Sequence, residues 1–270
     1  MSLPAYALVT GASAGIGAAF ARELAARGHA LVLTARRLDR LESLAAELRA
    51  QHGIAVECIA CDLADATAPA FLFDEIQRRG IAIDLLINNA GYGVTGSLVS
   101  HPWQTHEDFI RVMVAAPTEL CYRFVPAMRE RGYGRIVNVG SLAGLTPAPG
   151  GHTLYAASKA YLIKFSQALA LENRRYGIHV CALCPGFVRS EFHDVNGARS
   201  TVSKMPDWIW LDSARVVREG LDAVERGTIV RVSGWHYRML KAFFDLLPDA
   251  LALKLVARNS HKFRVTDDAK

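Results

Sequence analysis

The sequence predicts a doubly wound α/β fold, in which a parallel sheet of about seven strands lies between two layers of helices. Short apolar runs alternate along the chain with longer segments of helical periodicity. The runs are apolar at consecutive positions and not at every second one, which is typical of strands that are covered on both faces. The chain has 270 residues, of which 51% are hydrophobic, and this is enough for one large core.

The predicted elements follow one another as strand, helix and strand along the whole chain. The predicted strands are Tyr6–Thr10, Ala30–Ala35, Val56–Cys61, Asp84–Asn88, Arg135–Gly140, His179–Cys184 and Thr228–Ser233. The predicted helices begin near Ile16, Leu38, Thr67, Thr105, Thr153 and Ser213. Neither an internal repeat nor a long polar linker interrupts this order. We therefore expect a single domain over residues 1–270, with a core at about 4–233 and a helical extension at about 235–262.

The composition argues against several classes of protein. The formal net charge is +5, and the basic residues are scattered among acidic ones, which argues against a nucleic acid partner. Asp245, Pro248 and Lys254 interrupt the most apolar segment before it reaches the roughly 18 residues of a membrane span, so we expect no integral membrane segment. The first apolar run is too short for a signal peptide, so we expect a cytoplasmic protein.

Two cysteine pairs have the spacing of zinc ligands, Cys58 with Cys61 and Cys181 with Cys184. Both pairs fall within predicted strands, where an offset of three residues points the two side chains of a pair to opposite faces. The residues between them also lack the turn formers of a zinc knuckle. We therefore predict reduced core cysteines and no metal site.

The first predicted strand leads through a glycine-rich loop into a helix. Residues 10–17 read Thr-Gly-Ala-Ser-Ala-Gly-Ile-Gly. The glycines allow a tight turn, let a pyrophosphate approach the backbone, and allow the helix to pack closely on the sheet. A pyrophosphate there would meet the free N–H groups and the positive dipole end of the helix. The predicted nucleotide-binding residues of this loop are Gly11, Ser13, Ala14, Gly15, Ile16 and Gly17.

The end of the second predicted strand bears on the choice of nucleotide. A site that prefers NAD places a carboxylate there to accept hydrogen bonds from the adenosine ribose, and this chain has Ala35 instead. Arg36 and Arg37 follow, and they can pair with a ribose 2′-phosphate through charge-assisted contacts. The alternative interpretation is a pair of solvated arginines at the start of a helix. We predict NADP(H) as the cofactor.

Polar residues also follow the third and fourth predicted strands. Asp62 is placed to contact the adenine amine, and the Asn-Asn-Ala-Gly segment at 88–91 is placed to line the ribose. From these two segments we assign to the cofactor site Asp62, Leu63, Asn89, Ala90 and Gly91.

The chain resembles the short-chain dehydrogenase/reductase family over about residues 6–233. The matching motifs, in the family's order and spacing, are the loop at 10–17, Asn-Asn-Ala-Gly at 88–91, Ser141, Tyr155 with Lys159, and Pro185 with Gly186. The resemblance implies a Rossmann-type sheet with the nicotinamide near Tyr155, and a homodimer or homotetramer. We also assign Pro185, Gly186 and Val188 to the cofactor site.

The predicted catalytic residues are Ser141, Tyr155 and Lys159. Tyr155 and Lys159 lie four positions apart in a helical segment and therefore share a face. A free tyrosine has a pKa of about 10, so a proton donor that works near neutral pH needs a shift of roughly 3 units, or about 4 kcal/mol. We expect the lysine ammonium and the oxidised nicotinamide to supply this shift. Tyr155 would then protonate the carbonyl oxygen, Ser141 would hydrogen-bond it, and Lys159 would also hold the nicotinamide ribose.

Two positions depart from the family's pattern. Met113 stands where the helix after the fourth strand usually has an asparagine that helps to hold a water leading to the lysine. A methionine side chain cannot make that hydrogen bond. Activity then depends on whether the backbone carbonyl suffices, and we predict that it does. Gly140 stands where a second serine is common, which is a milder change.

Two loop segments, Leu142–Leu154 and Phe187–Trp210, are predicted to wall the substrate pocket. Their proline and aromatic residues suit a lipophilic carbonyl or alcohol better than a sugar. His152 and His193 flank this pocket and are expected to contact substrate at most. The segment Trp235–Arg258 is predicted as an added helical stretch rich in Phe and Leu, which covers the pocket, forms a subunit contact or lies on a membrane surface.

The main hypothesis is an enzyme, an NADP(H)-dependent reductase of ketones or aldehydes that also works in reverse as an alcohol dehydrogenase. A second hypothesis is a nucleotide-sensing or scaffolding protein without turnover, which Met113 favours. A third is a peripheral membrane reductase that acts on lipids. The intact Ser141, Tyr155 and Lys159 favour the enzyme.

Overall fold

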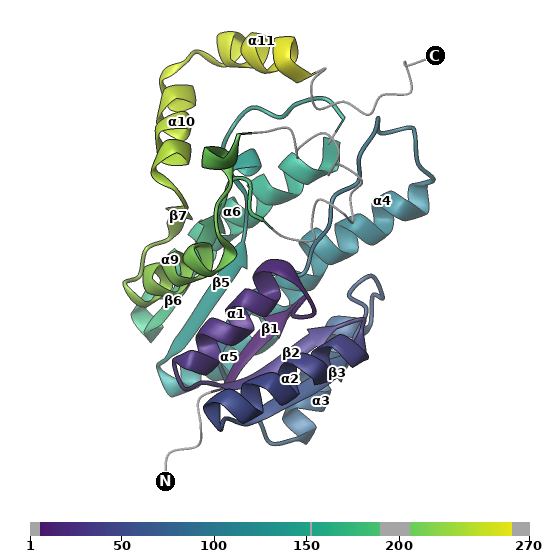
Figure 1. The fold of residues 1–270 in the computed structure, drawn as a ribbon, viewed down its shortest axis with the longest axis vertical. Coiled ribbons are helices and arrows are strands. Elements are labelled where there is room, and N and C mark those ends of the chain that lie inside the picture. The colour runs from purple at the N-terminus through teal and green to yellow at the C-terminus, as the bar shows by residue number, and fades with distance from the viewer. Residues whose placement is uncertain (1–5, 152, 190–205, 261–270) are drawn as a thin grey trace.

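The computed structural model describes residues 6–151, 153–189 and 206–260, and these ranges contain one sheet of seven parallel strands (Figure 1). The strands are β1 Tyr6–Thr10, β2 Ala30–Ala35, β3 Val56–Ala60, β4 Ile83–Asn88, β5 Gly134–Val139, β6 Ile178–Cys184 and β7 Val230–Val232. The predicted α/β fold with about seven parallel strands is confirmed.

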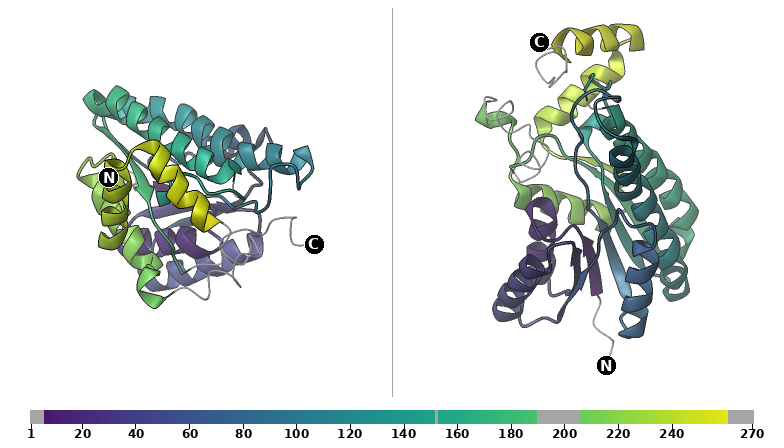
Figure 2. Two further views of the ribbon diagram at one scale, coloured as in Figure 1. Left: turned by 90° about the horizontal axis from the view of Figure 1, so that it is seen from above. Right: turned by 90° about the vertical axis from the view of Figure 1, so that its right-hand side faces the viewer.

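Helices connect the strands and cover both faces of the sheet (Figure 2). The helices that contribute to the core on one face are α1 Gly15–Ala26, α2 Leu38–His52 and α9 Ser213–Glu225. The helices on the other face are α3 Ala68–Arg78, α5 Ala116–Arg131 and α6 Thr153–Asn173. The remaining α-helices of the described ranges are α4 Trp103–Ile110, α10 Trp235–Leu246 and α11 Asp249–Ser260.

Strand β1 shows why its residues are apolar at consecutive positions. Ala7 and Val9 are buried in the cluster that includes α1 and α2, whereas Leu8 is buried in the cluster that includes α3 and α5. Val32 of the neighbouring strand joins Leu8. Because successive side chains of a strand point to opposite faces, both sets of positions need apolar residues in a sheet that is covered twice.

The strand order places a crevice at the carboxyl end of the sheet. The order is β3-β2-β1-β4-β5-β6-β7, so the chain adds strands first on one side of β1 and then on the other. Val9 of β1 is paired with Leu33 on one side and with Ile87 on the other. The loops after β1 and β4 therefore lead away in opposite directions, and ligands of open α/β sheets bind where this happens.

The helix predicted to begin near Thr105 is not continuous. After α4, a π-helical turn covers Arg111–Ala115 before α5 begins, and the amide of Ala116 donates to the carbonyl of Arg111, five residues back. Pro117 has no N–H group and cannot donate to the carbonyl of Met113, four residues back. One bond of the α-helical ladder is therefore missing at this turn.

The C-terminal extension contains two helices and not one. α10 ends at Leu246 and α11 begins at Asp249, so the predicted stretch Trp235–Arg258 is helical but is divided at Leu247 and Pro248. Leu247 has an extended backbone, with φ −87° and ψ 140°, because the residue before a proline is disfavoured in the helical region. None of the helices in the described ranges combines the length and the apolar content needed to cross a bilayer.

Candidate active site

The glycine loop between β1 and α1 is shaped for close contact with another group. Gly11 and Gly15 have φ values of +67° and +55°, which favour glycine. A Cβ atom on Gly17 would lie 2.2 Å from the carbonyl oxygen of Gly11, so no other residue fits there. Ala14 at the N-cap of α1 has no polar side chain to cap the first turn. The amides at this end are thus available to a phosphate.

Thr10 ties the ends of β1 and β4 together. Its hydroxyl donates to the carbonyl of Ile87 at 3.1 Å and accepts from the amides of Asn89 and Ala90, each at 3.0 Å. The side-chain amide of Asn89 donates to the carbonyl of Thr10 at 2.9 Å and to that of Gly11 at 3.3 Å. The predictions included Asn89, Ala90 and Gly11 as site residues but not Thr10, whose polar side chain at the end of an apolar strand was the signal.

The residues predicted to bind the adenosine end lie on the same edge of the sheet. Arg36 and Arg37 follow β2 and are exposed, and Arg37 Nη2 donates to Ser13 Oγ at 3.1 Å. Asp62 follows β3 and is exposed, and its Oδ1 accepts from the amide of Ala64 at 3.1 Å. A 2′-phosphate bound there would lie near the guanidinium group of Arg37, which contacts the glycine loop. Leu63 is buried in the core beneath this edge.

Tyr155, Lys159 and Ser141 come together beyond the end of β5. The Lys159 Nζ lies 5.7 Å from the centre of the Tyr155 ring and donates to the carbonyl of Val139 at 2.7 Å. Lys159 is buried, whereas Tyr155 is half-buried. Ser141 hydrogen-bonds with Tyr155, and its Oγ accepts from the amide of Ala143 at 3.2 Å. Tyr155 and Lys159 were predicted to share one face of the helix, and this face is directed toward Ser141.

Burial dominates the pKa values of this cluster. Burial raises the pKa of Tyr155 to about 12, and the hydrogen bond with Ser141 acts in the opposite direction. Burial also lowers the pKa of Lys159 to about 8. The protein alone therefore does not lower the pKa of Tyr155 as the sequence had led us to expect. The shift in favour of the phenolate has to come from a positive charge that arrives with the cofactor.

Met113 lies in the π-helical turn, and its thioether fills the space next to the loop after β4. The residue is 1% exposed, and a Cβ on Gly91 would lie 2.8 Å from Met113 Sδ. The side chain therefore packs as a core residue beneath this loop. The α-helical partner of its carbonyl would be the amide of Pro117, which does not exist. The carbonyl of Met113 therefore receives no hydrogen bond from an amide four residues ahead, which leaves it more available to accept one from a water molecule.

Replacing Met113 with asparagine tests whether the missing amide matters. If the backbone carbonyl at 113 suffices for proton transfer, Met113→Asn changes kcat by less than about threefold and lowers stability by about 1–3 kcal/mol, because a buried polar group replaces a thioether. Rates and urea unfolding would be measured on both proteins. A rise in kcat of about tenfold or more would show that the chain lacks a group it needs.

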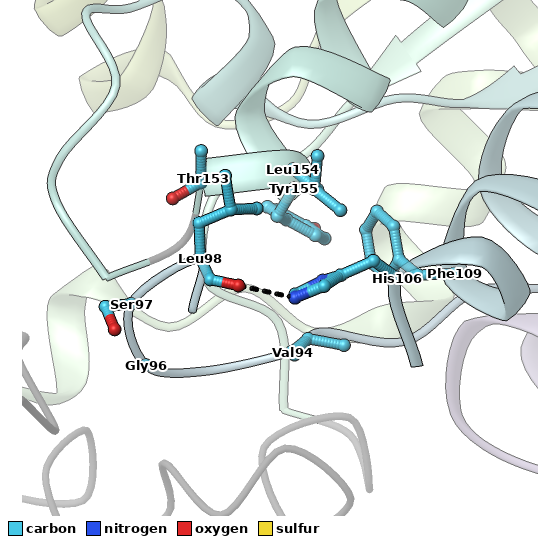
Figure 3. Close-up of a pocket in the computed structure, with 9 residues that line it drawn as sticks. All are labelled: Val94, Gly96, Ser97, Leu98, His106, Phe109, Thr153, Leu154 and Tyr155. Atoms are coloured by element: carbon cyan, nitrogen blue, oxygen red, sulfur yellow. Dashed lines mark hydrogen bonds between the residues drawn. The ribbon is translucent and has the colours of Figure 1, made fainter. Parts of the chain in front are cut away.

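A narrow pocket lies beside Tyr155, between the loop after β4, helix α4 and the start of α6 (Figure 3). Its apolar walls include Val94, Leu98, Phe109 and Leu154. His106 lines the same pocket, and its Nε2 donates to the carbonyl of Leu98 at 2.7 Å. Its Nδ1 is buried without a hydrogen-bond partner in the described ranges. His106 was not predicted as a site residue, because one histidine in an amphipathic helix gives no signal.

The segment after β6 is held in place by the C-terminal extension. A Cβ on Gly186 would lie 2.1 Å from Tyr237 Cζ, so the ring of Tyr237 needs a glycine beneath it. The Tyr237 hydroxyl accepts from the amide of Phe187 at 3.0 Å and donates to the carbonyl of Ile209 at 2.8 Å. Pro185 and Val188 on either side are buried. The C-terminal extension thus supports the segment after β6, which was predicted to contact the cofactor.

Other predicted features have varied outcomes. His152 and His193, the expected substrate contacts, lie outside the described residues, as does most of the predicted wall at 187–210. All five cysteines are free thiols, and both predicted pairs are in or next to β3 and β6. In the described ranges, no three His, Cys, Asp or Glu side chains are grouped so that they could hold a metal ion.

Comparisons with known proteins agree with this geometry. The family model of the short chain dehydrogenases matches residues 5–200. A short chain dehydrogenase of Pseudocercospora fijiensis is 35% identical over 206 residues, which are 74% of this chain and 65% of that relative, just under two thirds of its length.

Solved structures extend the similarity over most of the fold. The structure of a short-chain dehydrogenase from Sphingobium yanoikuyae in complex with NADPH has a TM-score of 0.80 and 34% identity, and the match covers 92% of this chain and 97% of that one. A bulky-bulky ketone specific alcohol dehydrogenase from Comamonas testosteroni has a TM-score of 0.75 and 30% identity, with 93% and 97% covered. The chain belongs to the short-chain dehydrogenase family of oxidoreductases.

Proposed function

We propose that this protein is an NADP(H)-dependent oxidoreductase that transfers a hydride between the cofactor and a carbonyl or alcohol carbon of a small lipophilic substrate. The observation that supports this proposal is the cluster of Tyr155, Lys159 and Ser141 beside a narrow pocket, at the same end of the sheet as the glycine loop. The proposed cofactor is supported by the fit of the loop, where Gly17 leaves no room for a side chain, and by the relative solved with NADPH.

The proposed mechanism assigns one role to each residue of the cluster. NADPH, when bound, supplies the hydride. Tyr155 gives a proton to the carbonyl oxygen in the reductive direction and takes it back in the oxidative one. Ser141 donates a hydrogen bond to the same oxygen and stabilises the charge that develops on it. Lys159 would hold the nicotinamide ribose, and the positive charge that favours the ionised form of Tyr155 would come with the oxidised cofactor.

The proposed cofactor contacts are those assigned from the sequence. They comprise the glycine loop, the two arginines after β2, and residues at the ends of β3, β4 and β6, together with Tyr155 and Lys159. Besides Tyr155 and Lys159, the set contains Gly11, Ser13, Ala14, Gly15, Ile16, Gly17, Arg36, Arg37, Asp62, Leu63, Asn89, Ala90, Gly91, Pro185, Gly186 and Val188. Of these, Leu63 is buried and would act through its backbone.

Arg36→Ala tests the choice of NADP(H) over NAD(H). We expect NADPH affinity to fall by about tenfold or more, because a charge-assisted contact to the 2′-phosphate is lost, while NADH affinity changes little. Fluorescence titration of both cofactors measures the two values. Arg40→Ala, an exposed arginine on the first turn of α2, is the matched control. Equal losses for NADPH and NADH in Arg36→Ala would contradict the assignment.

The pocket supports a lipophilic substrate. Val94, Leu98, Phe109 and Leu154 give it apolar walls, and Tyr155 provides the proton donor. The similar alcohol dehydrogenase from Comamonas testosteroni is specific for bulky-bulky ketones, so the proposed class of substrate is known for a similar enzyme. Assembly into a homodimer or homotetramer stays a prediction from the resemblance to the family.

The alternative is a nucleotide-binding sensor or scaffold with weak or no turnover. The observation in its favour is Met113, whose buried thioether occupies the place of a hydrogen-bonding side chain. The deciding experiment is the loss of NADPH absorbance with a panel of lipophilic ketones, aldehydes and quinones. Turnover supports the oxidoreductase, and tight NADPH binding with no turnover across the panel supports the sensor.

A further inference from the structure

The outer face of α10 is apolar along its whole length. Four large side chains recur at intervals of four, four and three residues, which puts them on one face of the helix. They are Trp235, Met239, Phe243 and Leu246, with exposed fractions of 66%, 64%, 51% and 86%. We call these four residues the α10 stripe. Contiguous exposed apolar surface of this kind marks an interaction site, because single exposed apolar residues need no partner but a row of them does.

The stripe is not the face with which α10 packs on its own domain. That face contains Tyr237, which is buried over Gly186 and hydrogen-bonded to the backbone of Phe187 and Ile209. Tyr237 packs over the segment after β6 and is not among the residues that line the pocket beside Tyr155. The stripe needs a partner outside the domain.

Further apolar groups lie next to the stripe. The Trp208 ring lies 5.8 Å from the His236 ring, which lies 5.9 Å from the Trp235 ring, and Trp208 is 68% exposed. Helix α11 follows with exposed Leu251 and Leu253. Tryptophan combines a large apolar ring with an N–H group and suits the boundary between hydrocarbon and water.

The charges around this surface are mainly positive. Residues 235–258 contain four basic and two acidic side chains. Lys241 pairs with Asp245, whereas Lys254 and Arg258 are exposed and form no ion pair with any residue in the described ranges. An exposed apolar face, together with two cations on the next helix that form no ion pair in the described ranges, is complementary to an anionic lipid surface.

We propose that the α10 stripe docks this protein on the surface of an anionic membrane, with α10 in the plane of the interface and Lys254 and Arg258 near the headgroups. A second copy of the chain is the less favourable occupant. A twofold contact through the stripe would bring together two chains that each have a formal net charge of +5, and like charges across an interface are costly. A lipid surface with negative headgroups offers the opposite sign.

Docking through α10 orients the catalytic end of the sheet toward the membrane. α10 begins three residues after the carboxyl end of β7, and α10 and α11 lie at the end of the molecule opposite the start of β1 (Figure 1). Tyr237 connects α10 directly to the segment after β6. A lipophilic molecule dissolved in the bilayer would therefore be presented to the end of the protein that contains Tyr155. The docking itself does not depend on the proposed reaction.

The test is sedimentation of the full chain with vesicles of phosphatidylcholine alone and of phosphatidylcholine mixed in equal parts with phosphatidylglycerol. We expect the protein to sediment with the mixed vesicles and far less with the neutral ones. Met239→Ser/Phe243→Ser removes the middle of the stripe and should weaken binding to mixed vesicles by about tenfold or more. Lys254→Glu/Arg258→Glu should weaken it to a similar degree by reversing two charges.

Phe71→Ser/Leu171→Ser is the matched control, because both residues are exposed apolar side chains on other helices. It should bind mixed vesicles like the unchanged protein, and NADPH binding by all variants shows that they are folded. The proposal is overturned if the unchanged protein stays in the supernatant with mixed vesicles, or if the stripe variant binds as well as the control. It is equally overturned if light scattering shows that the stripe variant splits a dimer while vesicle binding is unchanged, which would make the stripe a subunit contact.

Discussion

Tyr155→Phe is expected to lower kcat for carbonyl reduction by about 100- to 10,000-fold, the range that a positioned proton donor contributes. The substitution removes one oxygen atom and keeps the ring, which lies 5.7 Å from Lys159 Nζ. NADPH affinity should change by less than about threefold, because the phosphate and adenosine contacts are elsewhere. The measurement is the rate of NADPH oxidation with the best substrate of the panel, together with a titration of NADPH fluorescence.

Tyr161→Phe provides the matched control on the same helix. Tyr161 lies six residues further along α6, and its hydroxyl is 2.9 Å from the Thr118 hydroxyl, away from Ser141. The control should keep nearly full turnover. If Tyr155→Phe also keeps it, Tyr155 is not the proton donor and the proposed mechanism is wrong. If both variants lose NADPH binding, the effect is on the fold of α6 and not on proton transfer.

The fold could be predicted because burial on both faces of the sheet leaves a pattern in the sequence. Leu8 and Val9 contact different core clusters, yet each must be apolar, so the strands stand out as continuous apolar runs. The helix boundaries were visible where a local signal exists, as at Ser213, which follows the capping residue Asp212. The break at Pro248 had such a signal too, because the residue before a proline is disfavoured in the helical region.

The site could be predicted as far as short motifs describe it. The glycines of the loop and the spacing of Tyr155 and Lys159 are local properties of the chain. The pKa of Tyr155 is not, because it depends on how deeply the phenol is buried, and burial is decided by packing among distant segments. The same holds for His106 and for Tyr237, which reach the site from α4 and α10 and gain their surroundings only in the folded chain.

The π-helical turn at Arg111–Ala115 could be predicted only in part. Pro117 is visible in the sequence, and its missing N–H group removes the bond to the carbonyl of Met113 wherever the helix forms. The sequence alone does not reveal that the amide of Ala116 donates to the carbonyl of Arg111, five residues back, or that Met113 packs against Gly91. The chemical departure at position 113 was therefore predictable, but its structural setting was not.

Gly17→Ala is expected to weaken NADPH binding by about 100-fold, equivalent to about 3 kcal/mol. The added methyl group would lie 2.2 Å from the carbonyl oxygen of Gly11 and 2.6 Å from Asn89 Nδ2. The first of these atoms belongs to the backbone, so the loop has to move away from α1 to admit the methyl group. That movement would displace the amides proposed to hold the pyrophosphate and the Asn89 bond to Thr10.

Gly53→Ala separates this effect from a general loss of stability. Gly53 caps α2 with a φ of +64°, and nothing lies within 4 Å of an added Cβ, so alanine there costs about 1 kcal/mol of backbone strain and nothing at the cofactor site. Isothermal titration with NADPH and urea unfolding would be compared for both variants. A Gly17→Ala protein that binds NADPH as tightly as Gly53→Ala does would show that the loop is only a connection between β1 and α1. Weakened binding confined to Gly17→Ala would identify close packing of this loop as the property that the cofactor requires.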